Sequence, residues 1–495
     1  MSVYYSNNYT YKSFPTIHKA LMKLFQILFC LLISIGITHA SSNEESMPPK
    51  IAKALKKFGL SNDSISINIA DVDSNTTLLN LNPDTVRNPA STMKILTSLA
   101  ALDILGAGHL WRTGFYRTKS IEDDTLQGDL FIRAGGDPLI LLEDMLASLL
   151  ALRLRGIQKI AGNLVIDSSI YDESTINRTP LDGKSDRVYN VSPSALSINF
   201  RATQFIFSPD GDRLKILAYP PAINLRIINE VQLINGNCNG AWRKLLPSTS
   251  ASSNTTHVRF TGTYPKSCGE QSITRSIQSS DQYIYGVFGA LWKALGGSIA
   301  GKLVYESVPD DAKLIYERVS RPMFDVLRGI NKYSNNLMAR MLLLGIGGEV
   351  YNEPSTPEAG RLAIKEWLTK QSLNLPGLII DNGSGLSRNS RITAAGLGSL
   401  LQYARNHIHY EEFAASLSLS GIDGSTRKRF SDENNRGRFR LKTGLLNGVR
   451  AVAGFSRTVK GTNLRIVILH NHPKVNYSNG NAIQNTILKY ANENF

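Results

Sequence analysis

Apolar and polar residues alternate along short stretches at the two ends of the chain. Residues 64 to 69 place isoleucine at every second position, which is the period of a strand with one buried face. The far end predicts three more strands, over 439 to 442, 449 to 455 and 464 to 469, with turns at 444 to 448 and 460 to 463. Amphipathic helices are predicted over 48 to 60 and 482 to 490. We therefore expect one antiparallel sheet, flanked by helices and assembled from both ends of the chain.

The pattern changes between about residue 113 and residue 317, where many short β-like runs replace the longer alternation. Five of these runs lie over residues 129 to 133, 162 to 167, 204 to 207, 224 to 228 and 257 to 260. A tract of serine, asparagine and threonine at 248 to 256 predicts a surface loop. The middle of the chain is therefore predicted to be a mainly-β insertion into an α+β protein.

The beginning of the chain carries an export signal. Residues 24 to 37 form one apolar run that follows Lys19 and Lys23 and precedes the small residues around Ala40. The run is too short to cross a bilayer comfortably, because a membrane helix needs about 20 apolar residues. We expect cleavage after Ala40, with retention as an N-terminal anchor as the alternative. The part from Met22 onward is a compact signal by itself, which is compatible with translation starting there.

Composition narrows the class of protein. The 495 residues are 42% hydrophobic and 19% charged, which excludes disorder or a collagen-like repeat for most of the chain and is compatible with about three domains. The formal net charge of +15 is compatible with anionic partners, but solvated basic faces explain it equally well. Neither an arginine-rich run nor a nucleic-acid-binding motif stands out, so nucleic acid is not an expected partner.

Two cysteines remain after the expected cleavage, because Cys30 lies within the signal. Cys238 and Cys268 stand 30 residues apart in an exported chain, and we predict a disulfide between them. Neither belongs to a metal-binding cysteine cluster. The tripeptide His470-Asn471-His472 ends an apolar strand and has no companion ligands, so we predict no metal site.

Three short motifs carry the candidate chemistry: Ser91-Thr92-Met93-Lys94, Ser334-Asn335-Asn336 and Lys442-Thr443-Gly444. Ser91 directly precedes an apolar helical run, which places it at a helix N-terminus with Lys94 one turn further on the same face. A serine hydroxyl needs a neighbouring base, and a lysine can serve when burial or a second cation such as Lys442 lowers its pKa. Gly444, at the end of its strand, would let a substrate lie against the strand edge.

The order and spacing of these motifs resemble the penicillin-binding D-alanyl-D-alanine carboxypeptidase/endopeptidase family of low molecular mass. The stretch of 243 residues between Ser91 and Ser334 matches the tripartite members, which carry inserted domains there. Further similar stretches lie at 128 to 130, 135 to 138, 162 to 167, 193 to 196, 381 to 388 and 420 to 425. The resemblance implies a penicillin-recognising serine hydrolase fold with inserted mainly-β domains, and it covers nearly the whole mature chain.

The resemblance also implies roles for the first two motifs. Ser91 would attack the carbonyl between two terminal D-alanines while Lys94 takes its proton. Ser334 would pass that proton to the departing D-alanine, and Asn336 would hold Lys94 and the substrate amide. Ser334 as a simple helix cap and Asn336 as an ordinary polar residue at a helix start are the alternatives.

The third motif is assigned to the substrate by the same resemblance. Lys442 and Thr443 would bind the terminal carboxylate beside Gly444, and the N–H groups of Ser91 and Leu445 would form an oxyanion hole. Water would then hydrolyse the acyl-enzyme. The family's activity implies neither a cofactor nor a metal.

A side-chain pocket for the diaminopimelate of the stem peptide is a further implication. Asp167 would accept its ammonium, Tyr171 would supply an aromatic wall and Arg388 would bind its carboxylate. The alternative is that Asp167 only begins a turn and that Arg388 is an ordinary surface side chain.

The family resemblance divides the chain into a signal and three domains. These are a signal peptide over 1 to 40, a catalytic transpeptidase-like domain over 41 to 112 and 318 to 495, inserted domain II over 113 to 204 and 286 to 317, and inserted domain III over 205 to 285. The expected location is the periplasm, where peptidoglycan stem peptides and β-lactams are the expected partners. Peripheral association with a membrane stays open.

Two other functions compete with this interpretation. A β-lactamase shares the first and third motifs, but it has aspartate where this chain has Asn335, and the segment beginning at Glu366 lacks the asparagine that would complete a deacylation loop. A non-catalytic peptidoglycan-binding scaffold is the second alternative, although all three motifs are intact here.

Overall fold

The computed structural model describes residues 47–252, 255–352, 354–430 and 432–495. The predicted signal peptide and its cleavage site lie outside these ranges. Among the helices of these ranges, none combines the length and the apolar character that crossing a membrane requires.

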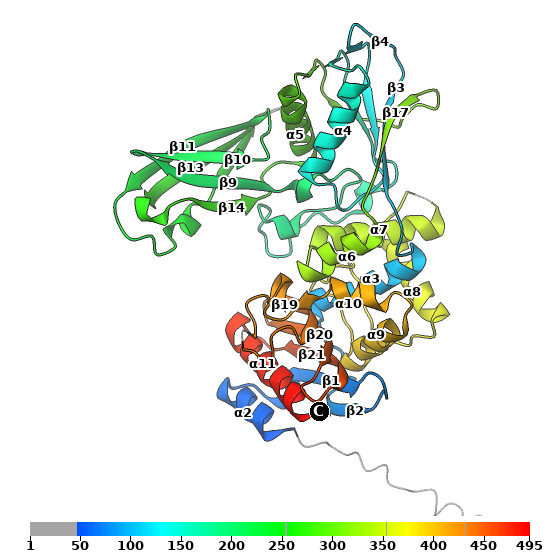
Figure 1. The fold of residues 1–495 in the computed structure, drawn as a ribbon, viewed down its shortest axis with the longest axis vertical. Helices are drawn as coiled ribbons and strands as arrows, with labels where there is room; N and C mark the ends of the chain where they lie inside the picture. The colour runs from blue at the N-terminus through cyan, green and yellow to red at the C-terminus, as the bar shows by residue number, and fades with distance from the viewer. Residues whose placement is uncertain (1–46, 253–254, 353, 431) are drawn as a thin grey trace, which may run out of the picture. The chain divides into compact units, whose positions relative to one another are not determined.

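A six-stranded antiparallel sheet joins the two ends of the described chain (Figure 1). Its order is β18 (Ser418–Leu419), β19 (Phe439–Leu446), β20 (Val449–Arg457), β21 (Asn463–Asn471), β1 (Ile65–Asp71) and β2 (Thr77–Leu81). Strand β1 pairs with β21 along its whole length, from Ile65 opposite His470 to Asp71 opposite Leu464. The prediction of one sheet built from both ends of the chain is therefore confirmed.

Alternating side chains give this sheet two apolar faces. On β21, Leu464, Ile466 and Ile468 pack with helices α2 (Pro49–Lys57) and α11 (Tyr477–Asn494). Val467 and Leu469 face the opposite side, where they join a second core built around helix α3 (Lys94–Ile104). Because both faces are covered by helices, the central strands are buried almost completely.

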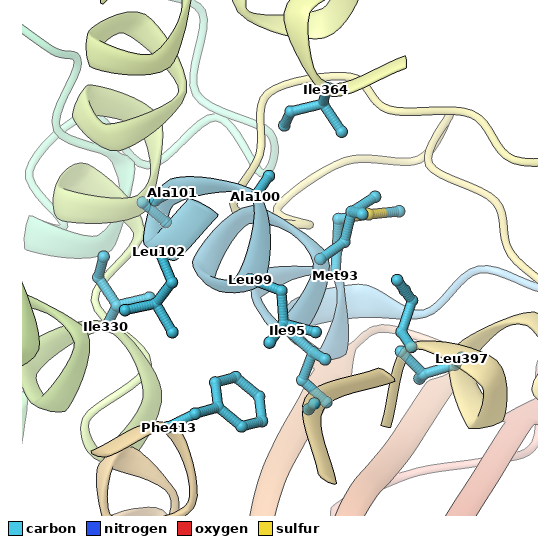
Figure 2. Close-up of a cluster of buried hydrophobic side chains, with 14 of the residues drawn as sticks. Met93, Ile95, Leu99, Ala100, Ala101, Leu102, Ile330, Ile364, Leu397 and Phe413 are labelled. Atoms are coloured by element: carbon cyan, nitrogen blue, oxygen red, sulfur yellow. The ribbon is translucent and has the colours of Figure 1, made fainter. Parts of the chain in front are cut away.

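Helix α3 lies at the centre of that second core, and Figure 2 shows its side chains among those of its neighbours. Every residue from Lys94 to Leu102 is buried, so the helix is enclosed on all sides. Apolar residues of the surrounding helices contact it, including Ile330, Ile364, Leu397 and Phe413. These neighbours are α6 (Met323–Lys332), α7 (Asn336–Tyr351), α8 (Pro357–Lys370), α9 (Ala394–Asn406) and α10 (Tyr410–Ser416).

The insertion begins with two small mixed sheets around one core. One sheet has the order β16 (Leu303–Tyr305), β8 (Leu164–Asp167), β6 (Leu130–Arg133), β3 (Arg112–Arg117) and β17 (Lys313–Val319). The other has the order β15 (Ser298–Ile299), β7 (Lys159–Ile160), β5 (Thr125–Leu126) and β4 (Ile121–Glu122). Helices α4 (Leu142–Leu154) and α5 (Ser280–Ala294) pack in the same core.

Two three-stranded sheets make up the rest of the insertion. They are β10 (Arg213–Tyr219), β9 (Thr203–Asp210) and β14 (Gln271–Arg275), and β11 (Leu225–Ile234), β13 (Thr255–Pro265) and β12 (Ser248–Ser252). A core of aromatic residues lies between them, with Phe205 and Phe207 packed edge-on against Phe260. Cys238 and Cys268 form a disulfide beside this core, with Cα atoms 4.7 Å apart, as predicted.

Short 3-10 turns complete the described secondary structure. They lie at Asn62–Ser64, Ala90–Met93, Glu173–Thr175, Val188–Asn190, Asn199–Arg201, Ala241–Lys244, Lys266–Cys268 and Gly424–Thr426. The mixture of helices and several sheets agrees with the predicted α+β class with mainly-β insertions. The domain boundaries stay predictions.

Two details of the predicted elements are wrong. The polar tract at 248 to 256 is not a loop throughout, because β12 pairs with β13 from Ser248 opposite Arg259 to Ser252 opposite Thr255. All five side chains of β12 are exposed, so backbone pairing rather than apolar burial makes it a strand. The turn predicted from Gly444 to Gly448 is shorter than expected, because β19 continues to Leu446.

Candidate active site

Ser91 lies in the 3-10 turn Ala90–Met93, directly before helix α3. The turn begins with an unusual backbone conformation, because Ala90 has a positive φ of 46°. Gly385 approaches the Ala90 carbonyl so closely that a Cβ atom would overlap with it, and Gly385 itself has a φ of +72°. This close packing fixes the turn that carries the serine.

Lys94 begins helix α3, and its ammonium group lies at the centre of a small polar network. Its Nζ lies 3.1 Å from Ser91 Oγ, 2.7 Å from Asn336 Oδ1 and 2.5 Å from the carbonyl oxygen of Ser384. The side chain is fully buried. The two oxygens of Asn336 and Ser384 orient the amine towards Ser91, as general-base chemistry requires.

The two lysines of the motifs are both buried, and burial changes their protonation. Burial lowers the pKa of Lys94 well below its ordinary value, and the positive charge of Lys442 lowers it further. Burial also lowers the pKa of Lys442, to about 7. Burial and the charge of Lys442 are thus the physical causes of the lowered pKa of Lys94, and its role as a base stays a prediction.

Ser334 and Lys442 form the second half of the network. Lys442 Nζ donates to Ser334 Oγ over 2.9 Å and to the carbonyl oxygen of Thr443 over 2.7 Å. Ser334 has a φ of 58°, which is uncommon for a residue other than glycine and indicates a constrained position. The N-cap of helix α7 is Asn335, whose side chain accepts from the N–H of Met338, so Ser334 is not the helix cap.

Asn336 is the first residue of helix α7, and both the oxygen and the nitrogen of its side-chain amide make hydrogen bonds. The oxygen accepts from Lys94, while the nitrogen donates 3.0 Å to the carbonyl oxygen of Tyr189. Tyr189 belongs to the insertion, and its side chain is 45% exposed. Asn336 therefore connects the base to a segment that stands outside the six-stranded sheet.

Strand β19 carries the third motif beside the serine turn. The Thr443 hydroxyl donates to Ser425 Oγ over 2.8 Å. A Cβ atom on Gly444 would lie 2.7 Å from the Pro89 carbonyl oxygen and 2.9 Å from the Ala451 Cβ, so the glycine is required for packing against the residues before Ser91. The sequence-based idea that Gly444 lets a substrate lie against the strand edge stays a prediction. Leu445, the next residue, is 52% exposed.

Among the described residues, no carboxylate makes a hydrogen bond to the six motif side chains of this site, which are those of Ser91, Lys94, Ser334, Asn336, Lys442 and Thr443. Glu366, which begins the segment that lacks the asparagine of a β-lactamase deacylation loop, accepts a hydrogen bond from the Tyr351 hydroxyl over 2.9 Å. The candidate base among these side chains is therefore a lysine.

Asp167 ends strand β8 and is 4% exposed. Its carboxylate accepts from the Val308 N–H over 3.0 Å and the Ser169 N–H over 3.1 Å, and Arg133 lies 3.4 Å away. Burial alone would raise the pKa of Asp167, but the hydrogen bonds from Ser169, Val308 and Arg133 outweigh it and lower the pKa. These contacts favour a structural role at the end of the strand.

Tyr171 and Arg388 are also engaged with protein atoms. Tyr171 is buried, with its hydroxyl 3.3 Å from the Gly136 carbonyl oxygen and 3.5 Å from that of Met341 on helix α7. Arg388 is exposed and donates to the Asn447 carbonyl oxygen over 2.7 Å. These contacts do not join Asp167, Tyr171 and Arg388 to one another, and the diaminopimelate pocket stays a prediction.

Three contributors to the network had no assigned role in the sequence interpretation. Ser384 supplies a carbonyl to Lys94, Ser425 pairs with Thr443, and Tyr189 supplies a carbonyl to Asn336. Ser384 and Ser425 fall inside the stretches 381 to 388 and 420 to 425, whose resemblance to the family was the available signal. Backbone carbonyls leave no residue-specific trace, so Tyr189 had none.

The two histidines of the tripeptide at 470 to 472 lie at the end of strand β21 and directly after it. His470 is fully buried, and its Nε2 lies 3.0 Å from Ser64 Oγ. Among the described residues, no group of three or more histidine, cysteine or acidic side chains is arranged to hold a metal ion.

A serine beside a buried lysine, together with a sheet built from both ends of the chain, is typical of serine hydrolases of the penicillin-recognising class. Comparison with known proteins makes the class specific. The chain belongs to the D-Ala-D-Ala carboxypeptidase 3 (S13) family, whose model matches residues 48–494, and it is thus a serine-type D-alanyl-D-alanine carboxypeptidase.

Relatives of known sequence agree with this assignment. A D-alanyl-D-alanine carboxypeptidase of Haemophilus influenzae is 24% identical over 445 residues, covering 89% of this chain and 90% of that protein. A D-alanyl-D-alanine carboxypeptidase of an Actinomadura strain is 25% identical over 385 residues, covering 74% of this chain and 70% of that protein.

Solved structures support the fold. The crystal structure of penicillin binding protein 4 of Haemophilus influenzae has a TM-score of 0.74 at 22% identity, covering 89% of this chain and 98% of that one. A second structure of the same protein, in complex with a β-lactam, has a TM-score of 0.69.

Proposed function

We propose that this protein cleaves the peptide bond before a terminal D-alanine in peptidoglycan stem peptides. The reaction passes through an acyl-enzyme on Ser91, and β-lactams acylate the same serine. The observation that carries the proposal is the placement of Lys94 Nζ, 3.1 Å from Ser91 Oγ and within a buried network. Family membership supports the choice of substrate, and the geometry of the site supports the roles proposed for the residues.

The first step transfers the Ser91 proton to Lys94. A neutral lysine amine has two N–H groups and one lone pair, and the two oxygens of Asn336 and Ser384 can accept both N–H groups. The lone pair is then left for the Ser91 proton, while Oγ attacks the substrate carbonyl. The lowered pKa of Lys94 keeps the amine neutral for this purpose.

The second step expels D-alanine. The proton held by Lys94 must reach the leaving nitrogen, and Ser334 is the hydroxyl proposed to relay it. Ser334 Oγ accepts a hydrogen bond from Lys442, which leaves its own O–H free to donate to the departing amine. Lys442 and Thr443 bind the terminal carboxylate in this proposal, and the N–H groups of Ser91 and Leu445 bind the oxyanion.

The last step hydrolyses the acyl-enzyme and restores the serine. Because no described carboxylate hydrogen-bonds to the proposed catalytic side chains, Lys94 is the group proposed to activate water. When a β-lactam ring opens, its leaving group stays covalently attached to the acyl group. The resulting acyl-enzyme resists hydrolysis, so the penicillin adduct is expected to persist. The related H. influenzae protein was crystallised with a β-lactam, which supports the same chemistry here.

The periplasm is the proposed location, since the sequence begins with an export signal and peptidoglycan is the proposed partner. Cleavage of a crosslink between two stem peptides requires the same bond chemistry as removal of a terminal D-alanine. We therefore include endopeptidase action in the proposal.

One experiment tests the activity and separates it from a non-catalytic scaffold. Mature protein is incubated with an acetylated Lys-D-Ala-D-Ala peptide and, separately, with purified crosslinked stem-peptide dimers. We expect release of D-alanine from the first and of monomers from the second, and neither with Ser91→Ala. Binding of both substrates without cleavage would favour the scaffold, and equal cleavage by Ser91→Ala would contradict the proposed nucleophile.

A further inference from the structure

A groove of about 500 Å³ lies at the end of the six-stranded sheet where strand β19 begins. Four arginines line it: Arg405 from helix α9, Arg438 just before β19, Arg440 on β19 and Arg457 at the end of β20. We call these four residues the arginine groove. None of the residues proposed for catalysis is among those that line it.

The arginines bring together charges that the fold itself does not need. The Arg457 N–H donates to the Arg438 carbonyl oxygen, so Arg457 at the end of β20 stands opposite Arg438 directly before β19. Like charges in that position destabilise a sheet. An anionic ligand bound in the groove would offset this repulsion between like charges. Such a ligand explains why the arginines are kept together at the surface.

Most of the positive charge in the groove is not neutralised by the protein. Arg405 lies 3.1 Å from Asp73, and Arg438 reaches only a backbone carbonyl, that of Thr458. Within the described parts of the chain, the side chains of Arg440 and Arg457 make neither a hydrogen bond nor an ion pair, and both are exposed. Glu411 is the one carboxylate that lines the groove.

The wall of the groove is rigid on one side. The Arg405 guanidinium lies over the Tyr410 ring, 4.8 Å from its centroid, and Tyr410 packs edge-on against Phe455. Stacking holds that guanidinium in one orientation, so less freedom is lost when it binds a ligand.

We propose that the arginine groove binds phosphate groups, carried by a soluble phosphate compound or by the headgroup of an anionic lipid. Guanidinium groups match phosphate oxygens through paired N–H donors, and several arginines around one groove suit a ligand with clustered negative charge. The four arginines come from three separate segments of the chain. For this reason the sequence alone shows no basic motif at these positions. The proposal does not depend on the proposed peptidase activity.

The test uses the mature full-length protein and two charge-matched double variants. Arg440→Gln with Arg457→Gln removes the two exposed, unpaired arginines of the groove. Arg213→Gln with Lys215→Gln removes two exposed charges from strand β10 of the insertion as the control. Binding of inorganic pyrophosphate is measured by calorimetry, and binding to vesicles is measured by sedimentation with phosphatidylglycerol and, separately, with phosphatidylcholine alone.

We expect the groove variant to lose at least tenfold in affinity for pyrophosphate or for phosphatidylglycerol vesicles, while the control binds like the wild type. Loss on vesicles alone identifies a lipid headgroup, and loss on pyrophosphate identifies a soluble phosphate compound. Without ligand, the groove variant should melt at the wild-type temperature or above it, since like-charge repulsion is relieved. Penicillin acylation should stay unchanged.

Three outcomes would overturn the proposal. Wild-type protein that binds neither pyrophosphate nor anionic vesicles has no phosphate site. Equal losses in the groove and control variants would indicate a general charge effect. Binding of carboxylate-bearing stem peptides in the groove, with no binding of phosphate, would show that the ligand belongs to another class.

Discussion

The six-stranded sheet and the sheet β11-β13-β12 are stabilised in different ways. Strand β20 is buried over all residues except the last, because helices cover both faces of its sheet. Strand β12 is exposed along its whole length, and β11 is buried only at Leu225. The first sheet therefore relies on apolar burial, whereas the second relies on backbone pairing, a small aromatic core and the Cys238–Cys268 disulfide.

This difference explains why the chemistry lies where it does. A buried environment lowers the pKa of a lysine, and both Lys94 and Lys442 are buried in the two-sided sheet and its helices. The exposed strands β11 and β12 could not provide such an environment. We therefore expect changes in the two regions to have separate effects, on reactivity in one and on local stability in the other.

Removal of the proposed base should have the largest effect. Lys94→Ala is expected to slow acylation by penicillin by about 10³-fold, because Ser91 then lacks a proton acceptor. The rate is measured with a fluorescent penicillin in stopped samples. Lys370→Ala, at an exposed position of helix α8, is the control and should react normally. A loss of similar size in the control would show that the effect is not specific to the base.

Reduction of the disulfide should act on the other region. The chain-entropy model gives about 3 to 4 kcal/mol for a closed loop of this size, so Cys238→Ser with Cys268→Ser should destabilise the insertion by up to that amount. Hydrogen exchange should accelerate for amides of β11 and β13 and stay unchanged for β20. Penicillin acylation should persist at the wild-type rate. A parallel loss of acylation would contradict the separation of the two regions.

The contrast between buried and exposed strands also determined which elements could be predicted from the sequence. The apolar positions Ile65, Ile67 and Ile69 and every second position of β21 from Leu464 to Ile468 were visible because these side chains face the apolar core that helices α2 and α11 share. The half-buried strand expected at 64 to 69 is wrong, because the polar positions of β1 between these isoleucines are buried as well. The polar strand β12 was missed, since its residues carry no such signal and only its pairing with β13 makes it a strand. The three motifs located Ser91, Lys94 and Lys442, but the carbonyl contacts from Ser384 and Tyr189 depend on backbone geometry that side-chain patterns do not encode.

Acid should weaken the buried sheet through His470. Burial lowers the pKa of His470 to about 4, and the charges of Arg87 and His472 act in the same direction. The unfolded chain, with a histidine pKa near 6.5, binds more protons between these values, so stability is lost as the pH falls from about 6.5 to about 4. The loss should total about 3 kcal/mol.

Urea unfolding at pH 7 and pH 4.5 checks this prediction against His470→Gln. The variant removes the titrating group, so its stability should fall less between the two pH values than that of the wild type. Equal falls in the two proteins would show that His470 does not set the acid limit.

The smallest expected effect concerns Lys442 and alkaline pH. With a pKa of about 7, Lys442 loses its charge as the pH rises, so kcat/KM for a D-Ala-D-Ala peptide should fall about tenfold by pH 8. Arginine stays charged throughout this range, so Lys442→Arg should lack the fall even if its overall rate is lower. An unchanged alkaline limb in the variant would assign that limb to another group.

The most direct test of the central claim is the intact mass of the protein before and after exposure to benzylpenicillin. We predict that the wild type gains the mass of one opened β-lactam, that peptide mapping places the adduct on Ser91, and that Ser91→Ala gains nothing. An adduct of full strength on Ser91→Ala, or an adduct mapped to another residue of the wild type, would contradict the account.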